Sequence, residues 1–423
     1  MKESFLHLVW QQQLLETTKM TTSQQEPIKI HQKGVLNTLQ GPDFSNALIE
    51  INNQKWAGNI EIHVKSSDWY AHKHQEDKNY QNVILHVVYD HDVEVFDQYS
   101  NPIPTLELKG LIFPLVIENY HQLMNTPHQW IFCEASFKNV DSFVLKHWLE
   151  RVYVERLERK TKEVEAVFGI TGNDWEATLF LTMAKYFGGN LNGTFFMDAF
   201  AQVDFATIRK TLVNKTASSL LFGLVGLLED EEIEDSYYQN LRKEFAYQKQ
   251  KYQLQNLTFP KLHFYGCRPQ NFPTIRLAQL IAFYETYTSV FVRFLNMGTE
   301  VDTYKQLFDI TMELYWQMHY NFDKSSKKSP KKISKSFVDL LLINVVVPVL
   351  FLHKKTKGED ATNLLELMYQ IPAEKNTIVE KFKQIGAEFN SALETQALLT
   401  LKKEYCNKER CTECTIGITC VQT

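Results

Sequence analysis

Apolar positions follow two different periods along the chain, and the change between them falls near residue 112. Before it, short apolar runs alternate with period two or are continuous, which is typical of β-strands. After it, apolar residues recur at helical spacing almost to the end. The pattern predicts an α+β chain, with a mixed α/β domain over residues 1–111, a larger all-α domain over 112–400 and a cysteine-rich segment over 401–423.

The first domain is predicted to begin with a helix within residues 1–20 and to continue as a sheet. Asn52-Asn53-Gln54 is expected to form a hairpin turn, and residues 83–89 form a nearly continuous apolar run that is typical of a strand buried on both faces. The polar and aromatic residues 66–82 are expected to hold a short helix. The predicted strands cover residues 47–51, 55–65, 83–89, 93–96 and 103–108.

The second domain is predicted to consist of helices, over residues 144–168, 175–187, 195–222, 236–253 and from 274 onward. Its most apolar run, residues 337–353, is interrupted by Asp339, Asn344 and Pro348. The run is too short to span a bilayer comfortably, so we expect a buried core helix rather than a membrane segment.

Composition agrees with a folded protein, since 44% of the 423 residues are hydrophobic and 22% are charged. The net charge of -5 gives no global basic signal for nucleic acid, although local basic patches remain compatible with it. The first residues lack the long apolar region of a signal peptide. We therefore expect a cytoplasmic protein.

Three polar residues alternate along the predicted strand over residues 55–65. Glu61, His63 and Lys65 share one face, while Ile60, Ile62 and Val64 share the other. A solvent-exposed strand face would explain the polar set. A catalytic or metal-binding face would explain it equally, because an acid, an imidazole and an ammonium suit proton transfer and metal binding.

The surrounding segment resembles the PD-(D/E)xK nuclease core, through Pro42-Asp43, the hairpin, the acid and lysine on the second strand, and the helix and buried strand that follow. The resemblance implies that Asp43 and Glu61 hold Mg²⁺, that Lys65 stabilises charge, and that the substrate is DNA or RNA. This chain departs from the pattern at the position two residues before Lys65, which is His63. His63 would then be a metal ligand or a substitute for the lysine.

Two other functions remain open. A non-catalytic scaffold or binding protein would use the same strand face to contact a partner. A metal-dependent hydrolase of small substrates would bind a transition metal through histidines, because imidazole suits such ions. The residues that could serve it are His72, His74, Asp77 and His86, although a polar loop explains them as well.

Four of the six cysteines lie within the last 18 residues, as Cys406, Cys411, Cys414 and Cys420. Their spacing, C-x4-C-x2-C-x5-C, predicts a metal site that holds either Zn²⁺ or a [4Fe–4S] cluster. Four thiolates fill every position of such a site, so its role is expected to be structural. The spacing of the last three cysteines resembles the iron–sulfur loop of endonuclease III-type glycosylases. In that family six residues separate the first two cysteines, whereas four separate Cys406 and Cys411 here.

The whole chain also resembles an uncharacterised bacterial family. The resemblance rests on the segments GPDF, GNIEIHVKSSDW, VILHVV and CRPQNFPTIRLAQL and on the terminal cysteines. It implies no activity. Within the fourth segment, Arg268 and Arg276 bracket a proline-containing loop, which is either a rigid turn or an anion site.

Overall fold

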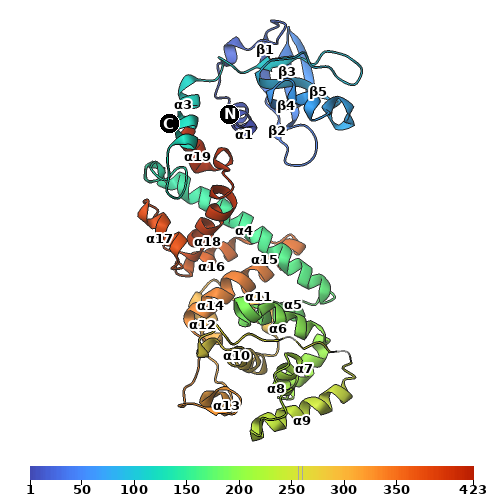
Figure 1. Ribbon diagram of the computed structural model, residues 1–423, viewed down its shortest axis with the longest axis vertical. Coiled ribbons are helices and arrows are strands. Elements are labelled where there is room, and N and C mark those ends of the chain that lie inside the picture. The colour runs from blue at the N-terminus through green and yellow to red at the C-terminus, as the bar shows by residue number, and fades with distance from the viewer. Residues whose placement is uncertain (256, 260) are drawn as a thin grey trace. The chain divides into compact units, whose positions relative to one another are not determined.

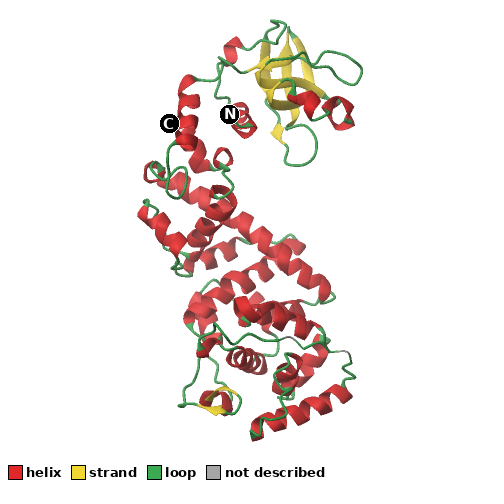
Figure 2. Cartoon of the chain, in the orientation of Figure 1, coloured by secondary structure: helices red, strands yellow, loops and turns green. Residues whose placement is uncertain are grey.

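The computed structural model describes residues 1–255, 257–259 and 261–423. It separates into two compact units, of which the first contains residues 1–149, 377–388 and 398–423, and the second residues 150–376 and 389–397. The first unit holds the six-stranded sheet and the second is almost entirely helical (Figure 2), which confirms the predicted α+β class. The predicted division at residue 112 falls inside the first unit, which also contains the cysteine-rich segment.

The sheet of the first unit has the strand order β1-β3-β4-β5-β6, with β2 paired to β3. Strands β1 to β5 are labelled in Figure 1. The pairs β1–β3 and β3–β4 are antiparallel, whereas the pairs β4–β5 and β5–β6 are parallel. The elements are α1 (Glu3–Gln12), β1 (Ile28–Gln32), β2 (Val35–Leu36), β3 (Phe44–Ile51), β4 (Gln54–Lys65), α2 (Asp68–Ala71), β5 (Val83–Asp90) and β6 (Thr105–Glu107).

The β3–β4 hairpin fixes the register of the polar strand face. Asn52 and Asn53 have φ values of +48° and +66°, as a type I′ turn requires, and Ile51 pairs with Gln54. The predicted hairpin turn is therefore confirmed. In the parallel ladder that follows, Glu61 of β4 lies opposite His86 of β5.

The buried central strand predicted over residues 83–89 is also confirmed, since β5 lies between β4 and β6 and its first six residues are buried. The strand predicted over residues 93–96 is wrong: only a single bridge between Phe96 and Pro102 forms there. The edge strand β1 was not predicted, because its exposed polar residues conceal the alternation.

Gly58 allows β4 and β5 to approach closely. A Cβ atom at this position would lie 2.5 Å from Ile84 Cγ2 and 2.6 Å from the Asn82 carbonyl oxygen. We expect Gly58→Ala to destabilise the protein by about 1–3 kcal/mol, as overpacking does. Urea unfolding measures the difference. The control is Gly169→Ala, where the added Cβ meets nothing within 4 Å. Equal stability of both variants would contradict the close approach.

The remainder of the first unit is helical and joins distant parts of the sequence. Its elements are α3 (Pro114–Asn125), the first residues of α4 (Ser142–Ile170), α17 (Thr377–Gln384), the end of α18 (Ala392–Leu401) and α19 (Thr415–Gln422). Helix α19 packs against α3, and Asn119 donates a hydrogen bond to the Val421 carbonyl at 3.2 Å. Lys2 forms an ion pair with Glu409 at 2.8 Å. The last 26 residues thus pack against segments near the start of the chain.

The second unit contains most of α4 and the start of α18, and a short hairpin, β7 (His319–Asn321) and β8 (Lys324–Ser325). Its other helices are α5 (Trp175–Phe187), α6 (Gly189–Ala201), α7 (Phe205–Val213), α8 (Ala217–Leu224), α9 (Ser236–Lys251), α10 (Pro273–Thr286), α11 (Val290–Leu295), α12 (Val301–Leu307), α13 (Leu314–Met318), α14 (Lys335–Leu341), α15 (Val347–Lys357) and α16 (Thr362–Gln370).

Helices α14 and α15 are joined by a π-helical segment, Leu342–Val346, into one continuous apolar helix. By length and composition alone this helix could cross a membrane, but 72% of its most apolar window is buried inside the structure. The predicted core helix is therefore confirmed. The π segment contains Asn344 and ends shortly before Pro348, which lacks the N–H that a regular helix needs.

Candidate metal centres

Strand β4 carries Glu61 and His63 on a face that is covered rather than solvated. Glu61 is 5% exposed and His63 is 1% exposed. Helix α1 packs against β4, and Glu3 from this helix reaches to 4.0 Å from His63 Nε2. The ordinary explanation of this polar face, exposure to water, therefore does not hold.

Three imidazoles and one carboxylate converge at this place. Glu61 Oε1 lies 3.4 Å from His63 Nε2 and 3.3 Å from His74 Nε2. His63 Nε2 lies 3.1 Å from His72 Nδ1. One ring nitrogen from each of the three histidines lies within 4.8 Å of the others, a spacing that a single metal ion can bridge. We call these four residues the histidine cluster.

The donor set of the histidine cluster fits a transition metal better than Mg²⁺. Imidazole nitrogen suits Zn²⁺, Fe²⁺ and related ions, whereas Mg²⁺ prefers oxygen ligands in octahedral geometry. The magnesium expected from the sequence would find one carboxylate among three nitrogens here.

His72 and His74 reach the cluster through the tight connection after β4. Asp68 accepts a hydrogen bond from the Lys65 backbone N–H at 2.9 Å, and Trp69 is buried beneath the turn. Lys73 then adopts a left-handed conformation, with φ of +60°. The reversal brings His74 back toward Glu61, and its ring stacks on that of Tyr80 with the two ring centroids 3.8 Å apart.

His86 supports the cluster from the neighbouring strand. Its Nε2 lies 2.8 Å from His63 Nδ1, and its side chain is fully buried. Burial, followed by the charges of His74 and His72, lowers the pKa of His63 to about 4. Burial, followed by the charge of His63, holds the pKa of His86 well below its usual range. Both imidazoles are therefore neutral at physiological pH, the state in which imidazole binds metals.

Asp43 lies directly beside Glu61. Its Oδ2 accepts a hydrogen bond from the Ile62 backbone N–H at 2.9 Å, and its own backbone N–H donates to Glu61 Oε2 at 3.1 Å. Burial, opposed by a hydrogen bond to His74, raises the pKa of Glu61, and the charge of Asp43 raises it further. The structure therefore brings together Asp43, Glu61 and His63, the first three residues predicted for the site.

Lys65, the fourth predicted residue, lies apart from this group. It ends β4 with an exposed side chain, and two residues along a strand already separate it from His63 by roughly 6.5–7 Å. Asp77 also serves a structural purpose, since it accepts a hydrogen bond from the Asn79 backbone N–H at 2.9 Å.

Glu3 and His7 were missed by reasoning from the sequence. Their spacing of four residues places them on one face of α1, and this was the available signal. His7 Nε2 lies 3.2 Å from Asp43 Oδ2. Burial opposes a charge on His7, but the hydrogen bond to Asp43 and the nearby carboxylates outweigh it and raise the pKa of His7.

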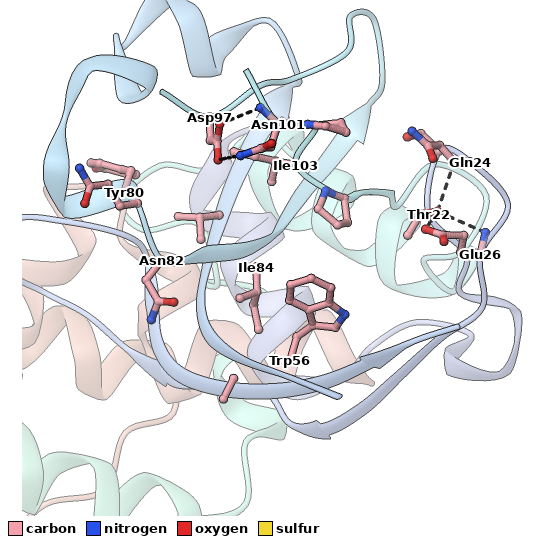
Figure 3. Close-up of a pocket in the computed structure, with 16 residues that line it drawn as sticks. Thr22, Gln24, Glu26, Trp56, Tyr80, Asn82, Ile84, Asp97, Asn101 and Ile103 are labelled. Atoms are coloured by element: carbon pink, nitrogen blue, oxygen red, sulfur yellow. Dashed lines mark hydrogen bonds between the residues drawn. The ribbon is translucent and has the colours of Figure 1, made fainter. Parts of the chain in front are cut away.

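A cavity of about 490 Å³ opens beside the sheet (Figure 3). Trp56 of β4 and Ile84 of β5 form part of its wall. Two pairs of its polar residues are bonded to each other, as Asp97 accepts from Asn101 and Thr22 donates to Glu26. None of the histidines of the cluster lines this cavity.

The four predicted cysteines gather around the short connection between the end of α18 and α19. Cys411 and Cys414 are buried, Cys406 and Cys420 are half-buried, and all four are free thiols. A Cβ atom at Gly417 would lie 2.2 Å from the Cys411 carbonyl oxygen, so the chain folds tightly on itself. The backbone N–H groups of Ile416 and Gly417 donate to the Cys414 sulfur.

A fifth cysteine, Cys133, lies near these four and was not predicted. Burial raises its pKa far above the usual range, and the nearby charges of Cys406, Cys414, Cys420 and Cys411 raise it further. Burial likewise raises the pKa of Cys406 and of Cys411 to about 12, and that of Cys414 to about 11. Deprotonating such closely grouped thiols requires a compensating cation, which a metal supplies.

Comparison with known proteins places the chain in a family but not beside any characterised relative. No curated protein and no solved structure matches it. A family model described as "Protein of unknown function (DUF2851)" matches residues 3–377, which include the histidine cluster but not the four terminal cysteines. The chain therefore belongs to this family of proteins of unknown function.

Proposed function

We propose that the first unit is a metal-dependent phosphodiesterase that acts on DNA or RNA, with a transition metal held by the histidine cluster. The observation that carries the proposal is the convergence of His63, His72 and His74 within bonding reach of one ion. Glu61 lies beside His63 and His74, and it is held next to Asp43. Buried polar groups of this kind are unfavourable unless they are paired or bind a metal.

The order of elements supports a nucleic-acid substrate. The β3–β4 hairpin, a short helix and a strand parallel to β4 follow one another after Pro42-Asp43, as the PD-(D/E)xK resemblance implies. Asp43 directly precedes β3 and Glu61 lies within β4, so one carboxylate comes from the turn and one from the following strand, as in that core.

The side chains divide the work between them. A bound metal lowers the pKa of a water molecule and stabilises charge on a phosphate. Asp43 orients Glu61 through its backbone N–H. His7, whose raised pKa favours the imidazolium, places a positive charge beside Asp43. We assign to His7 the charge-stabilising role that the nuclease resemblance implies for Lys65.

Cleavage assays with Mn²⁺, Zn²⁺ or Mg²⁺ test the proposal. We expect Mn²⁺ or Zn²⁺ to support cleavage of DNA or RNA better than Mg²⁺, because three of the four ligands are nitrogens. His72→Ala should lower the metal affinity by about 10- to 100-fold. The control is His31→Ala. It removes a histidine of β1 that pairs with Glu50 of β3. Nucleic-acid binding without cleavage under every metal would contradict a catalytic function and favour the non-catalytic scaffold.

We further propose that the cysteine-rich segment holds a [4Fe–4S] cluster rather than Zn²⁺. Tetrahedral zinc requires thiolate sulfurs about 3.8 Å apart, given a Zn–S bond of about 2.3 Å. Among the residues that the structure describes, no three cysteine sulfurs lie within 4.8 Å of one another. Support for the cluster comes from the resemblance of the last three cysteines to the iron–sulfur loop of endonuclease III-type glycosylases.

A further inference from the structure

The helical second unit contains a cavity of about 900 Å³. It lies where α4, the α5–α6 junction, the loop before α10 and α14 meet. A volume of this size accommodates a small organic ligand. Its charged lining consists of Lys160, Lys185, Arg268 and Arg276, opposed by the single carboxylate of Glu163. The cavity is therefore basic, although the chain as a whole is acidic.

Arg276 carries a charge that its neighbours do not balance. Its guanidinium lies over the Phe337 ring, 3.7 Å from the centroid. It donates to Asn271 Oδ1 at 2.7 Å and to Gln279 Oε1 at 3.0 Å, and both acceptors are neutral amides. Burial alone lowers its pKa to about 10, so the group stays protonated. A partly desolvated guanidinium with neutral partners is stabilised by an anion.

The two lysines share one acid. Lys160 Nζ donates to Glu163 Oε1 at 3.1 Å, and Lys185 Nζ lies 3.7 Å from Glu163 Oε2. Lys160 also lies 3.4 Å from the Tyr186 hydroxyl. One carboxylate cannot neutralise two ammonium groups, so this side of the cavity also keeps an excess of positive charge.

The first turn of α6 lies at the same wall. Gly188, Gly189 and Asn190 line the cavity, and no side chain caps this 13-residue helix. The first amide groups of a helix lack acceptors within it, and the helix dipole makes this end attractive to anions. A Cβ atom at Gly193 would lie 2.3 Å from the Lys185 carbonyl oxygen, so the two helices pack closely at this junction.

A buried arginine, Arg156, lies next to a residue of the cavity wall. Arg156 is 7% exposed and donates through Nη2 to Asn344 Oδ1 at 2.9 Å. Asn344 belongs to the π-helical segment and lines the cavity. Arg156 Nη1 is buried without a hydrogen-bond partner. The charge of this group adds to the positive potential inside the cavity.

We propose that this cavity binds a small molecule of nucleotide size that carries one or more phosphate groups. Phosphate oxygens accept from the planar fork of arginine, from ammonium groups and from the amides of a helix N-terminus, and all three kinds of donor line this cavity. The inference concerns the second unit and does not depend on metal-dependent cleavage in the first.

Calorimetry on the full chain with ATP, pyrophosphate and adenosine tests the proposal. We expect ATP and pyrophosphate to bind and adenosine not to bind, because the cavity recognises phosphate. Arg276→Gln should weaken ATP binding at least 10-fold, as loss of a charge-assisted contact does. Lys185→Gln, at a more exposed position, should also weaken ATP binding. This variant replaces Arg276→Gln if that protein does not fold.

The matched control is Arg293→Gln. Arg293 also lies over an aromatic ring, 4.8 Å from the Tyr287 centroid, but is exposed and does not line the cavity. The Arg293→Gln variant should bind ATP as the unchanged protein does. The proposal is overturned if adenosine binds as well as ATP, if Arg276→Gln and Arg293→Gln have equal effects, or if a single-stranded oligonucleotide binds while ATP and pyrophosphate do not.

Discussion

Glu61→Gln is expected to lower metal-dependent cleavage by about 100- to 1000-fold, because it removes the anionic ligand of the histidine cluster. Glutamine keeps the shape of the side chain but not its charge. Glu61 Oε1 lies within 3.4 Å of both His63 Nε2 and His74 Nε2, where its charge would balance a divalent ion. Calorimetric titration with Mn²⁺ and Zn²⁺ would show the loss of affinity directly.

The same substitution should stabilise the metal-free protein. Burial raises the pKa of Glu61, which means that the ionised carboxylate is disfavoured in the folded state. Because the pKa of Glu61 is raised by folding, its protonated carboxyl contributes fully to the stability of the folded state below the unfolded pKa. This contribution is lost as the pH rises through the folded pKa. Glu61→Gln should therefore gain stability over the unchanged protein at neutral pH but not at pH 4.

These opposite effects separate a metal site from a structural one. Thermal unfolding at the two pH values measures stability, and cleavage assays measure function. Lys65→Gln, on the same strand, serves as the control and should leave the metal affinity unchanged, since its side chain is exposed. A Glu61→Gln protein that keeps its metal affinity, or that loses stability at neutral pH, would refute the assignment.

Cys414→Ser is expected to remove the metal of the cysteine-rich segment and to destabilise the first unit by more than about 4 kcal/mol. Cys414 is 6% exposed, precedes α19, and accepts hydrogen bonds from two backbone N–H groups. A serine hydroxyl does not replace a thiolate ligand. Without the metal, α19 would lose the link that holds it beside the other cysteines.

Elemental analysis for iron, sulfide and zinc decides the identity of the metal. Iron and sulfide in near-equal amounts would support the cluster, and zinc alone would refute it. Cys267→Ser is the matched control, because Cys267 lies in the second unit with its sulfur near the His263 carbonyl oxygen. A metal content that both substitutions leave unchanged would show that the cysteines are unligated.

The local features of the fold were predictable because they depend on neighbouring residues. The turn at Asn52-Asn53 follows from residues that tolerate positive φ, and the buried strand from Val83 follows from a continuous apolar run. The predicted helix over residues 195–222 was too long. Asp204 caps a new helix there, accepting from the Ala206 backbone N–H, and divides the segment.

The candidate site was predictable only in part, because long-range pairing completes it. Alternation along β4 placed Glu61 and His63 on one face, but the burial of that face depends on α1, about fifty residues earlier. His86 joins His63 only through the parallel register of β4 and β5. Cys133 lies far in sequence from the other four cysteines, and no local pattern marks it as their neighbour.

The first unit is built from segments far apart in the sequence, and this has a consequence for biosynthesis. Residues 398–423 pack into a unit whose other main part ends at residue 149. The intervening chain must therefore be translated before the unit can close, which takes roughly 10–50 s at the usual speed of a ribosome. During that interval the surface of α3 that receives α19 is uncovered. The nascent chain is then a target for chaperones, and any metal of the cysteine-rich segment is inserted after this delay.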